Sequence, residues 1–113
     1  QIMKRTFIAI AFMAGLSACT AKFMVPAQSD ADKAQSKYPG TTLADLSHGK
    51  ALIEQHCDKC HSYKSPKSRG EADWNVTIPK MVKKINGKAG STVLSAKDEK
   101  DILAYMVVMG KGK

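Results

Sequence analysis

The stretch Cys57-Asp58-Lys59-Cys60-His61 decides how this 113-residue chain is interpreted. Two cysteines three positions apart lie on one side of a helical turn, so their thiols can add to the two vinyl groups of one porphyrin. The imidazole of the adjacent His61 then falls beneath the iron as its proximal ligand. The pentapeptide therefore predicts one haem c, covalently bound through Cys57 and Cys60. Pro66 is a candidate for the backbone carbonyl that orients the His61 ring.

A Cys-x-x-Cys pair also occurs as a redox dithiol or as half of a zinc site. A four-ligand structural zinc site usually needs a second Cys or His pair, and the remaining cysteine is the distant Cys19. The strand and helix alternation that surrounds thioredoxin-like dithiols is absent from the sequence pattern. Both observations favour haem c over these alternatives.

The residues around the motif resemble the class I cytochromes c over about 46–110. That family has a glycine eight residues before the first haem cysteine and a bulky apolar residue four before it, here Gly49 and Ile53. Its C-terminal helix crosses the first helix at the glycine and packs an aromatic residue there, a position that Tyr105 matches. The resemblance implies an all-α, cytochrome c-like helical bundle wrapped around one covalently bound haem. Ile53 departs mildly from the family, where an aromatic residue is commoner.

The first 18 residues are predicted to be a secretory signal peptide. Lys4 and Arg5 precede an apolar run over 6–16 that is too short to span a bilayer. The run closes in Leu16-Ser17-Ala18-Cys19, which resembles the bacterial lipobox and implies that Cys19 is acylated. The alternative is an ordinary signal peptide that leaves Cys19 as a free thiol.

An acylated cysteine would anchor the protein to a membrane without a spanning helix. In the lipobox resemblance, Thr20 rather than aspartate after the cysteine favours the outer membrane. Haem c attachment also takes place outside the cytoplasm. The expected location is therefore the periplasmic or cell-surface side of a membrane.

The chain is expected to contain a single domain over 43–113. Residues 19–42 are rich in Ala, Lys, Ser, Gln and Asp, and are predicted to form the lipidated N-terminus and a flexible tether. The remaining stretch of roughly seventy residues is marginal for a polypeptide core alone, so haem would complete the core. It shows no internal repeat and no useful strand-like alternation.

Two of the expected helices have signals at their first turns. The first begins near Leu43 to Ser47, with Asp45 or Ser47 as its N-cap, and runs into the haem motif. The last begins after Ser95, and Asp98 three residues later completes a capping box. Its expected apolar face comprises Ile102, Leu103, Tyr105, Met106 and Met109.

A further helix is expected between them, and it contains the predicted distal ligand. Apolar residues recur at three and four positions from Trp74 to Ile85, and Asn86-Gly87 is the expected end. Pro79 either kinks this helix or lies in its first turn. The pattern W-x-x-x-I-x-x-M, which ends at Met81, is similar to a compact subgroup of cytochrome c domains.

Met81 is preferred as distal iron ligand because Met106 and Met109 lie at core spacing on the last helix, where methionine usually fills gaps. Core packing is the alternative for Met81 as well. His48 and His56 are expected to be surface residues rather than ligands.

Arg69 and Trp74 are candidates for contacts with the haem propionates. The alternatives are a solvated arginine and an ordinary core tryptophan.

The chain is basic, with a formal charge of +8, and eight of its basic residues lie between Asp58 and Lys88 with only three acidic ones. Such an excess steers transient docking on an acidic redox partner. Attraction to anionic lipids and plain solubility are the competing explanations. Nucleic acid is not expected as a partner in this compartment.

These observations predict a membrane-tethered, monohaem electron carrier that is not an enzyme and has no catalytic residues. A gas-binding or sensor protein with an open or weakly ligated distal site is one alternative, and an electron-transfer subunit of a larger respiratory complex is another. A small peroxidase lacks an obvious distal acid-base residue.

Overall fold

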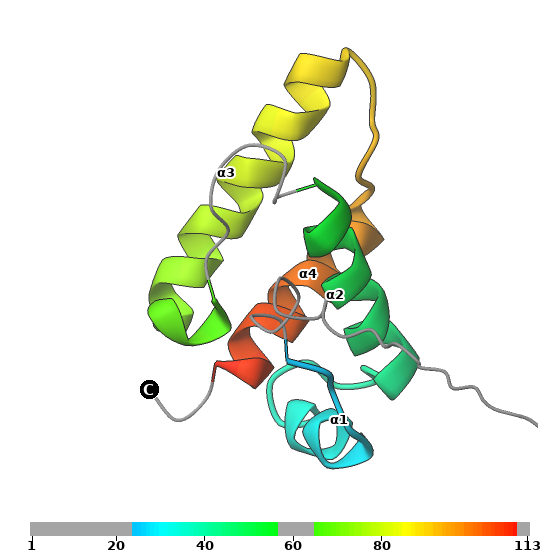
Figure 1. Cartoon of the computed structure of the whole chain (residues 1–113), viewed down its shortest axis with the longest axis vertical. Helices are drawn as coiled ribbons and strands as arrows, with labels where there is room; N and C mark the ends of the chain where they lie inside the picture. The colour runs from blue at the N-terminus through cyan, green and yellow to red at the C-terminus, as the bar shows by residue number, and fades with distance from the viewer. Residues whose placement is uncertain (1–23, 57–64, 111–113) are drawn as a thin grey trace, which may run out of the picture.

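The computed structural model describes residues 24–56 and 65–110 (Figure 1). The signal peptide, Cys19 and the pentapeptide with Cys57, Cys60 and His61 lie outside the described residues. Within them the chain forms α-helices, one short 3-10 helix and no strand, which confirms the predicted all-α fold. The helices are α1 (Gln28–Ala34), α2 (Leu43–His56), α3 (Glu71–Ala89) and α4 (Ala96–Met109), with the 3-10 helix η2 (Pro66–Ser68) before α3.

Helix α4 is the centre of the molecule because α1, α2, η2 and α3 all pack against it (Figure 1). Of its expected apolar face, Leu103 and Met109 are only half-buried, whereas Val107 and Val108 are buried as well. A helix that is covered from several sides needs apolar residues on more than one face. The part of α4 from Ile102 onward therefore supplies much of the core: Ile102, Ala104, Tyr105, Met106, Val107 and Val108.

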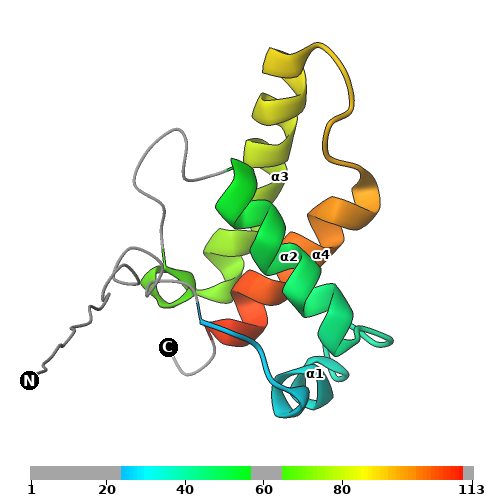
Figure 2. The same ribbon diagram turned by 45° about the vertical axis from the view of Figure 1, so that its right-hand side comes forward.

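Helix α2 crosses α4 at Gly49, as Figure 2 shows for the two helices. Gly49 is buried, and a Cβ atom on it would overlap the carbonyl group of Asp101. The absence of a side chain thus lets the two backbones come into contact. Leu46 and Ile53, one turn to either side, are buried along the same crossing.

The first turn of α2 is capped by Thr42, and not by Asp45 or Ser47 as predicted. The Thr42 hydroxyl accepts a hydrogen bond from the Asp45 backbone N–H (3.1 Å), and the Asp45 carboxylate accepts one from the Thr42 N–H (3.0 Å). Asp45 is therefore the third residue of the helix in a capping box that begins one residue before Leu43. The predicted box at the start of α4 is confirmed between Ser95 and Asp98.

Helix α3 is longer than predicted, because it starts at Glu71, runs through Pro79 and ends at Ala89. The stop is Gly90, whose left-handed φ of 71° lets its N–H bond back to the carbonyls of Asn86 and Gly87. Asn86 remains helical, and its side chain bonds to the α3–α4 connection instead. Its Oδ1 accepts the N–H groups of Val93 and Leu94, and its Nδ2 donates to the Leu94 carbonyl.

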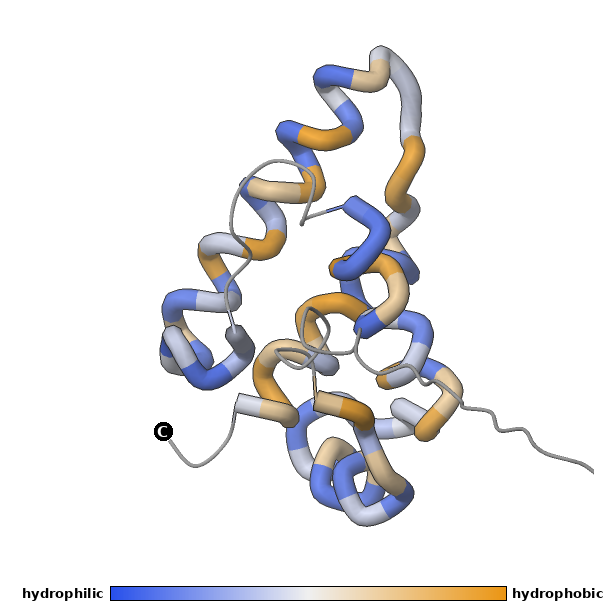
Figure 3. Tube along the Cα trace, in the orientation of Figure 1, coloured by the Kyte–Doolittle hydropathy of each residue, from blue (hydrophilic) through white to orange (hydrophobic). Residues whose placement is uncertain are grey.

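Residues 19–42 are predicted to be a flexible tether, but part of this stretch is folded in the structure. Residues 28–34 form α1, which packs against α4 and α2. Ala31 and Ala34 are each 1% exposed. Figure 3 shows that α1 carries few strongly hydrophobic residues. Small side chains let it approach α4 closely without an obvious apolar stripe in the sequence, so hydrophobic periodicity does not reveal this helix.

Candidate functional site

The described structure contains the segments on either side of the pentapeptide, and also Met81, the predicted distal ligand. Helix α2 ends at His56, directly before the pentapeptide, and Figures 1 and 2 both place this end of α2 beside α3. Met81 is on α3 and half-buried, and it packs against the core cluster. Its neighbours on the helix, Ile78 and Val82, are buried. The position suits both an iron ligand and a packing residue, so the ligand role of Met81 stays a prediction.

The other two methionines considered as ligands are on α4. Met106 is 2% exposed and belongs to the hydrophobic core, and Met109 is half-buried at its edge. Both lie in or against the cluster that the spacing in the sequence predicts for them.

Trp74 and Arg69 are brought together in a direct contact that the sequence pattern does not predict. The Arg69 guanidinium lies 5.5 Å from the centre of the Trp74 ring, within cation–π range. Trp74 is 2% exposed, and its indole N–H donates to the Pro66 carbonyl at 3.0 Å. This indole has one donor. A propionate contact from Trp74 would therefore require that the bond to Pro66 be given up, whereas Arg69 keeps further N–H groups.

The Pro66 carbonyl is the group that the sequence offers for orienting His61. It already accepts the Trp74 N–H, but a carbonyl oxygen has two lone pairs and can take a second donor. Pro66 also lies against the end of α4, because a Cβ atom on Gly110 would come within 2.5 Å of its oxygen. The carbonyl is thus held in place by α3 and α4 together.

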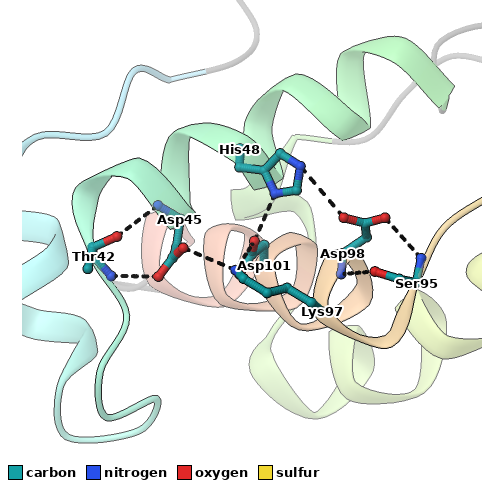
Figure 4. A network of polar contacts seen from close by, with 7 residues as sticks. All are labelled: Thr42, Asp45, His48, Ser95, Lys97, Asp98 and Asp101. Atoms are coloured by element: carbon teal, nitrogen blue, oxygen red, sulfur yellow. Dashed lines mark hydrogen bonds and ion pairs between the residues drawn. The ribbon is translucent and has the colours of Figure 1, made fainter.

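A polar network joins α2 to α4 beside the Gly49 crossing (Figure 4). His48 Nδ1 lies 2.8 Å from Asp101 Oδ2, and its Nε2 lies 3.6 Å from Asp98 Oδ1. Lys97 Nζ bridges Asp101 at 2.7 Å and Asp45 at 3.1 Å. His48 is therefore engaged between two carboxylates at the helix crossing, which makes it a structural residue of this interface.

Asp101 is the residue of this network that sequence reasoning missed, because it is 3% exposed and yet ionisable. A buried carboxylate needs partners, and here His48 and Lys97 supply them. Two features of the sequence point to these partners. Lys97 and Asp101 are four residues apart, a spacing at which opposite charges pair on a helix, and His48 is next to Gly49, where the helices cross.

The network also shifts the pKa values of Asp45 and Lys97. The pKa of Asp45 lies below its ordinary value, first because of the hydrogen bond from the Thr42 backbone and then because of the bond from Lys97. The pKa of Lys97 is raised by its bonds to Asp101 and Asp45. A depressed carboxyl pKa stabilises the fold above the unfolded-state pKa of about 4, and this contribution is lost as the pH falls through the folded-state value.

Replacing Asp45 by asparagine is expected to lower the free energy of unfolding by about 1 kcal/mol near neutral pH, because it weakens the cap and the bridge to Lys97. It should also flatten the loss of stability between pH 5 and pH 3. Urea denaturation at several pH values measures both effects. Asp73→Asn, which removes an exposed carboxylate from the first turn of α3, is the matched control for the loss of one negative charge.

A pocket of about 360 Å³ lies between α1, the start of α3 and the end of α4. Its lining includes Arg69 and Trp74, the two candidates for propionate contacts, but not Met81. Its charged side chains are Lys33, Lys37, Arg69 and Glu71. Lys37 and Glu71 pair with each other at 2.8 Å across the pocket, which joins α3 to the segment after α1.

Over residues 24–56 and 65–110, no three or more His, Cys, Asp or Glu side chains are arranged to hold a metal ion. None of the helices in this part of the chain has the length and apolar character needed to cross a bilayer. No family model, curated protein or solved structure matches the chain.

Proposed function

We propose that this protein is a lipid-anchored monohaem cytochrome c that passes single electrons between redox partners outside the cytoplasm. One observation carries the proposal. The C-x-x-C-H pentapeptide directly follows a helix that crosses the C-terminal helix at Gly49, eight residues before Cys57. The motif supplies the attachment chemistry, and the crossing is the one that the resemblance to class I cytochromes c implies.

The residues present fit haem c. Cys57 and Cys60 supply the two thiols, His61 the proximal imidazole, and α3 a half-buried thioether in Met81. When bound, the haem would supply reversible uptake and release of one electron. A His and Met ligand pair favours a higher reduction potential than two imidazoles would.

The other residues of the site would set orientation and environment. The Pro66 carbonyl, which Trp74 and the end of α4 hold in place, would accept the second ring N–H of His61 and so orient that ring. The apolar residues on the inner side of α3, Ile78 and Val82, would keep water from the site. The proposed activity is electron transfer and not catalysis.

Charge supports a protein partner with an acidic docking surface. Lys80, Lys83, Lys84 and Lys88 are all exposed on α3. We call these four residues the α3 lysine stripe. Like charges on one helix face raise the rate of encounter with an acidic partner, and the effect weakens as salt increases. Acylation of Cys19 would keep the protein at the membrane surface.

Mass and optical spectra of the exported protein test the proposal. We expect the mass of the mature chain to exceed that of the polypeptide by one haem and by the acyl groups on Cys19. The spectrum should show a thioether ligand in the oxidised state and little change when carbon monoxide is added to the reduced protein. A mature chain without added tetrapyrrole would contradict the proposal.

A gas-binding protein is the second candidate, and the packing of Met81 against the core is the observation that favours it. If Met81 is only a packing residue, the distal position is open. Rapid and complete carbon monoxide binding by the reduced protein would then be seen, in place of a closed six-coordinate spectrum.

A further inference from the structure

We infer that the protein exchanges electrons only in a layer next to the membrane that holds it, and does not reach far from that membrane on a long tether. This rests on the proposed function, because it requires that Cys19 be acylated. The cause is that residues 24–42 are built into the folded domain, so that little chain is left between the anchor and the fold. The limit on reach holds whichever face of the domain is turned toward the bilayer.

The first attachment of this segment is at Met24. The Tyr105 hydroxyl donates a hydrogen bond to the Met24 carbonyl at 2.7 Å, and the Tyr105 side chain is fully buried in the core. Burial raises the pKa of the Tyr105 phenol above its ordinary value, with a smaller contribution from the charge of Glu54, so the hydroxyl keeps its proton at neutral pH. Pro26 is buried as well. The chain is therefore already in contact with α4 at Met24.

Helix α1 and the residues after it are the second attachment. The helix packs against α4 and α2, and its two alanines, Ala31 and Ala34, are buried (Figure 2). Just after the helix, Lys37 Nζ lies 2.8 Å from Glu71 Oε1, which joins the same stretch to the start of α3. Tyr38 is half-buried and packs against the core cluster. The segment thus contacts all three of the longer helices.

Gln35 fixes the turn that leads from α1 into α2. Its side-chain amide donates to the carbonyls of Ala31 and Thr41, both at 2.7 Å, and its oxygen accepts the Gly40 N–H at 2.8 Å. Gly40 has a φ of 88°, which a residue with a side chain rarely adopts. Residues 24–42 are therefore held to the domain along their length and do not act as a spacer.

The chain that remains for the anchor is short. Five peptide steps separate Cys19 from Met24, and even a fully extended chain of that length spans only about 18 Å. A free segment over the whole of 19–42 would span about 80 Å. A domain of this size is roughly 30 Å across. Its farthest point therefore stays within about 50 Å of the headgroups in any orientation.

The short reach limits the kind of redox partner that the protein can serve. Electron transfer requires that the two redox centres come close together, so the centre of the partner must lie in the same layer. A partner that binds the α3 lysine stripe is then a protein of this membrane or one that comes to its surface. A redox centre held well beyond the layer is out of reach.

Hydrogen exchange of the full lipidated holoprotein tests whether the segment is folded. We expect the amides of α1 to exchange at least about ten-fold more slowly than those of an unfolded chain, because they are part of a helix that packs against α4. Exchange over 24–42 at the rate of an unfolded chain would overturn the inference, whatever the state of Cys19.

Neutron reflectometry of the same holoprotein on a supported bilayer measures the reach. The protein layer should end within about 50 Å of the headgroups. A Gly-Ser insertion of about forty residues between Lys22 and Phe23 should broaden the layer and move its centre outward by about 20 Å, because the root-mean-square length of the anchor rises from about 12 to about 35 Å.

The same Gly-Ser sequence added after Lys113 is the matched control, and it should leave the centre of the layer in place. A parent layer that extends well beyond 50 Å, and that the longer anchor does not change, would contradict the short reach. A chain that lacks acyl mass and fails to sediment with vesicles would overturn the anchor, and the short reach with it, while leaving the haem chemistry to its own optical test.

Discussion

Gly49→Ala is expected to destabilise the protein by about 3 kcal/mol, near the upper end for overpacking at a close contact. The added Cβ would overlap the Asp101 carbonyl, which is backbone of a central helix and has little room to move. Relief requires α2 and α4 to separate, and that would also stretch the bond between His48 and Asp101. Denaturant unfolding of the variant and the parent protein gives the difference in free energy.

Gly87→Ala is the matched control for this change. Gly87 lies inside α3, and a Cβ atom there would meet nothing within 4 Å. Alanine loses less backbone freedom than glycine on entering a helix, so this variant should gain about 0.5 to 1 kcal/mol. If both variants lost stability equally, the backbone contact at Gly49 would not be the cause, because Gly87 has no such contact.

Met81→Leu is expected to abolish the optical signature of a thioether ligand and to lower the reduction potential. Leucine keeps nearly the volume of methionine, so packing against the core should change by less than about 1.5 kcal/mol. Loss of the sixth ligand should also let the reduced protein bind carbon monoxide readily. Visible spectra and a potentiometric titration of the variant measure all three properties.

Met106→Leu and Met109→Leu are the controls, because both residues lie on α4 in or against the core. Each should retain the thioether signature of the parent protein. An unchanged spectrum in Met81→Leu, combined with a lost signature in either control, would assign the distal ligand to α4. A thioether signature that persists in all three variants would assign the ligand to a methionine other than these three.

The sequence predicted those elements whose signals are local. The box between Ser95 and Asp98 is such a case, because the two residues that form it are three positions apart and satisfy each other. The same signal is present at Thr42 and Asp45, but the prediction places the N-cap at Asp45 or Ser47, at least three residues too late. The all-α class followed from the periodicity of three and four and from the absence of strand-like alternation.

Other features depend on contacts between distant parts of the chain. Asn86-Gly87 resembles a helix end, yet α3 continues because the Asn86 side chain bonds to the following connection while Gly90 takes the left-handed conformation. Helix α1 depends on two alanines that become informative only when α4 lies against them. The buried Asp101 likewise makes sense only beside His48, which is far away in sequence.

For the site, the sequence predicts the ligand types, whereas the structure adds their surroundings. The half-buried position of Met81 and the engagement of Trp74 with Pro66 could not be read from spacing, because both depend on how α3 lies against α4. The roles of Cys57, Cys60 and His61 stay predictions from their motif.

The hydrogen bonds of the Asn86 side chain affect how readily this residue deamidates. Asparagine followed by glycine is the pair most prone to deamidation, which begins when the glycine nitrogen attacks the side-chain carbonyl. Here that carbonyl accepts the N–H groups of Val93 and Leu94, and Gly87 is held in helix geometry. The folded chain therefore shields its most labile amide, and the lifetime of that bond depends on how rarely the end of α3 opens.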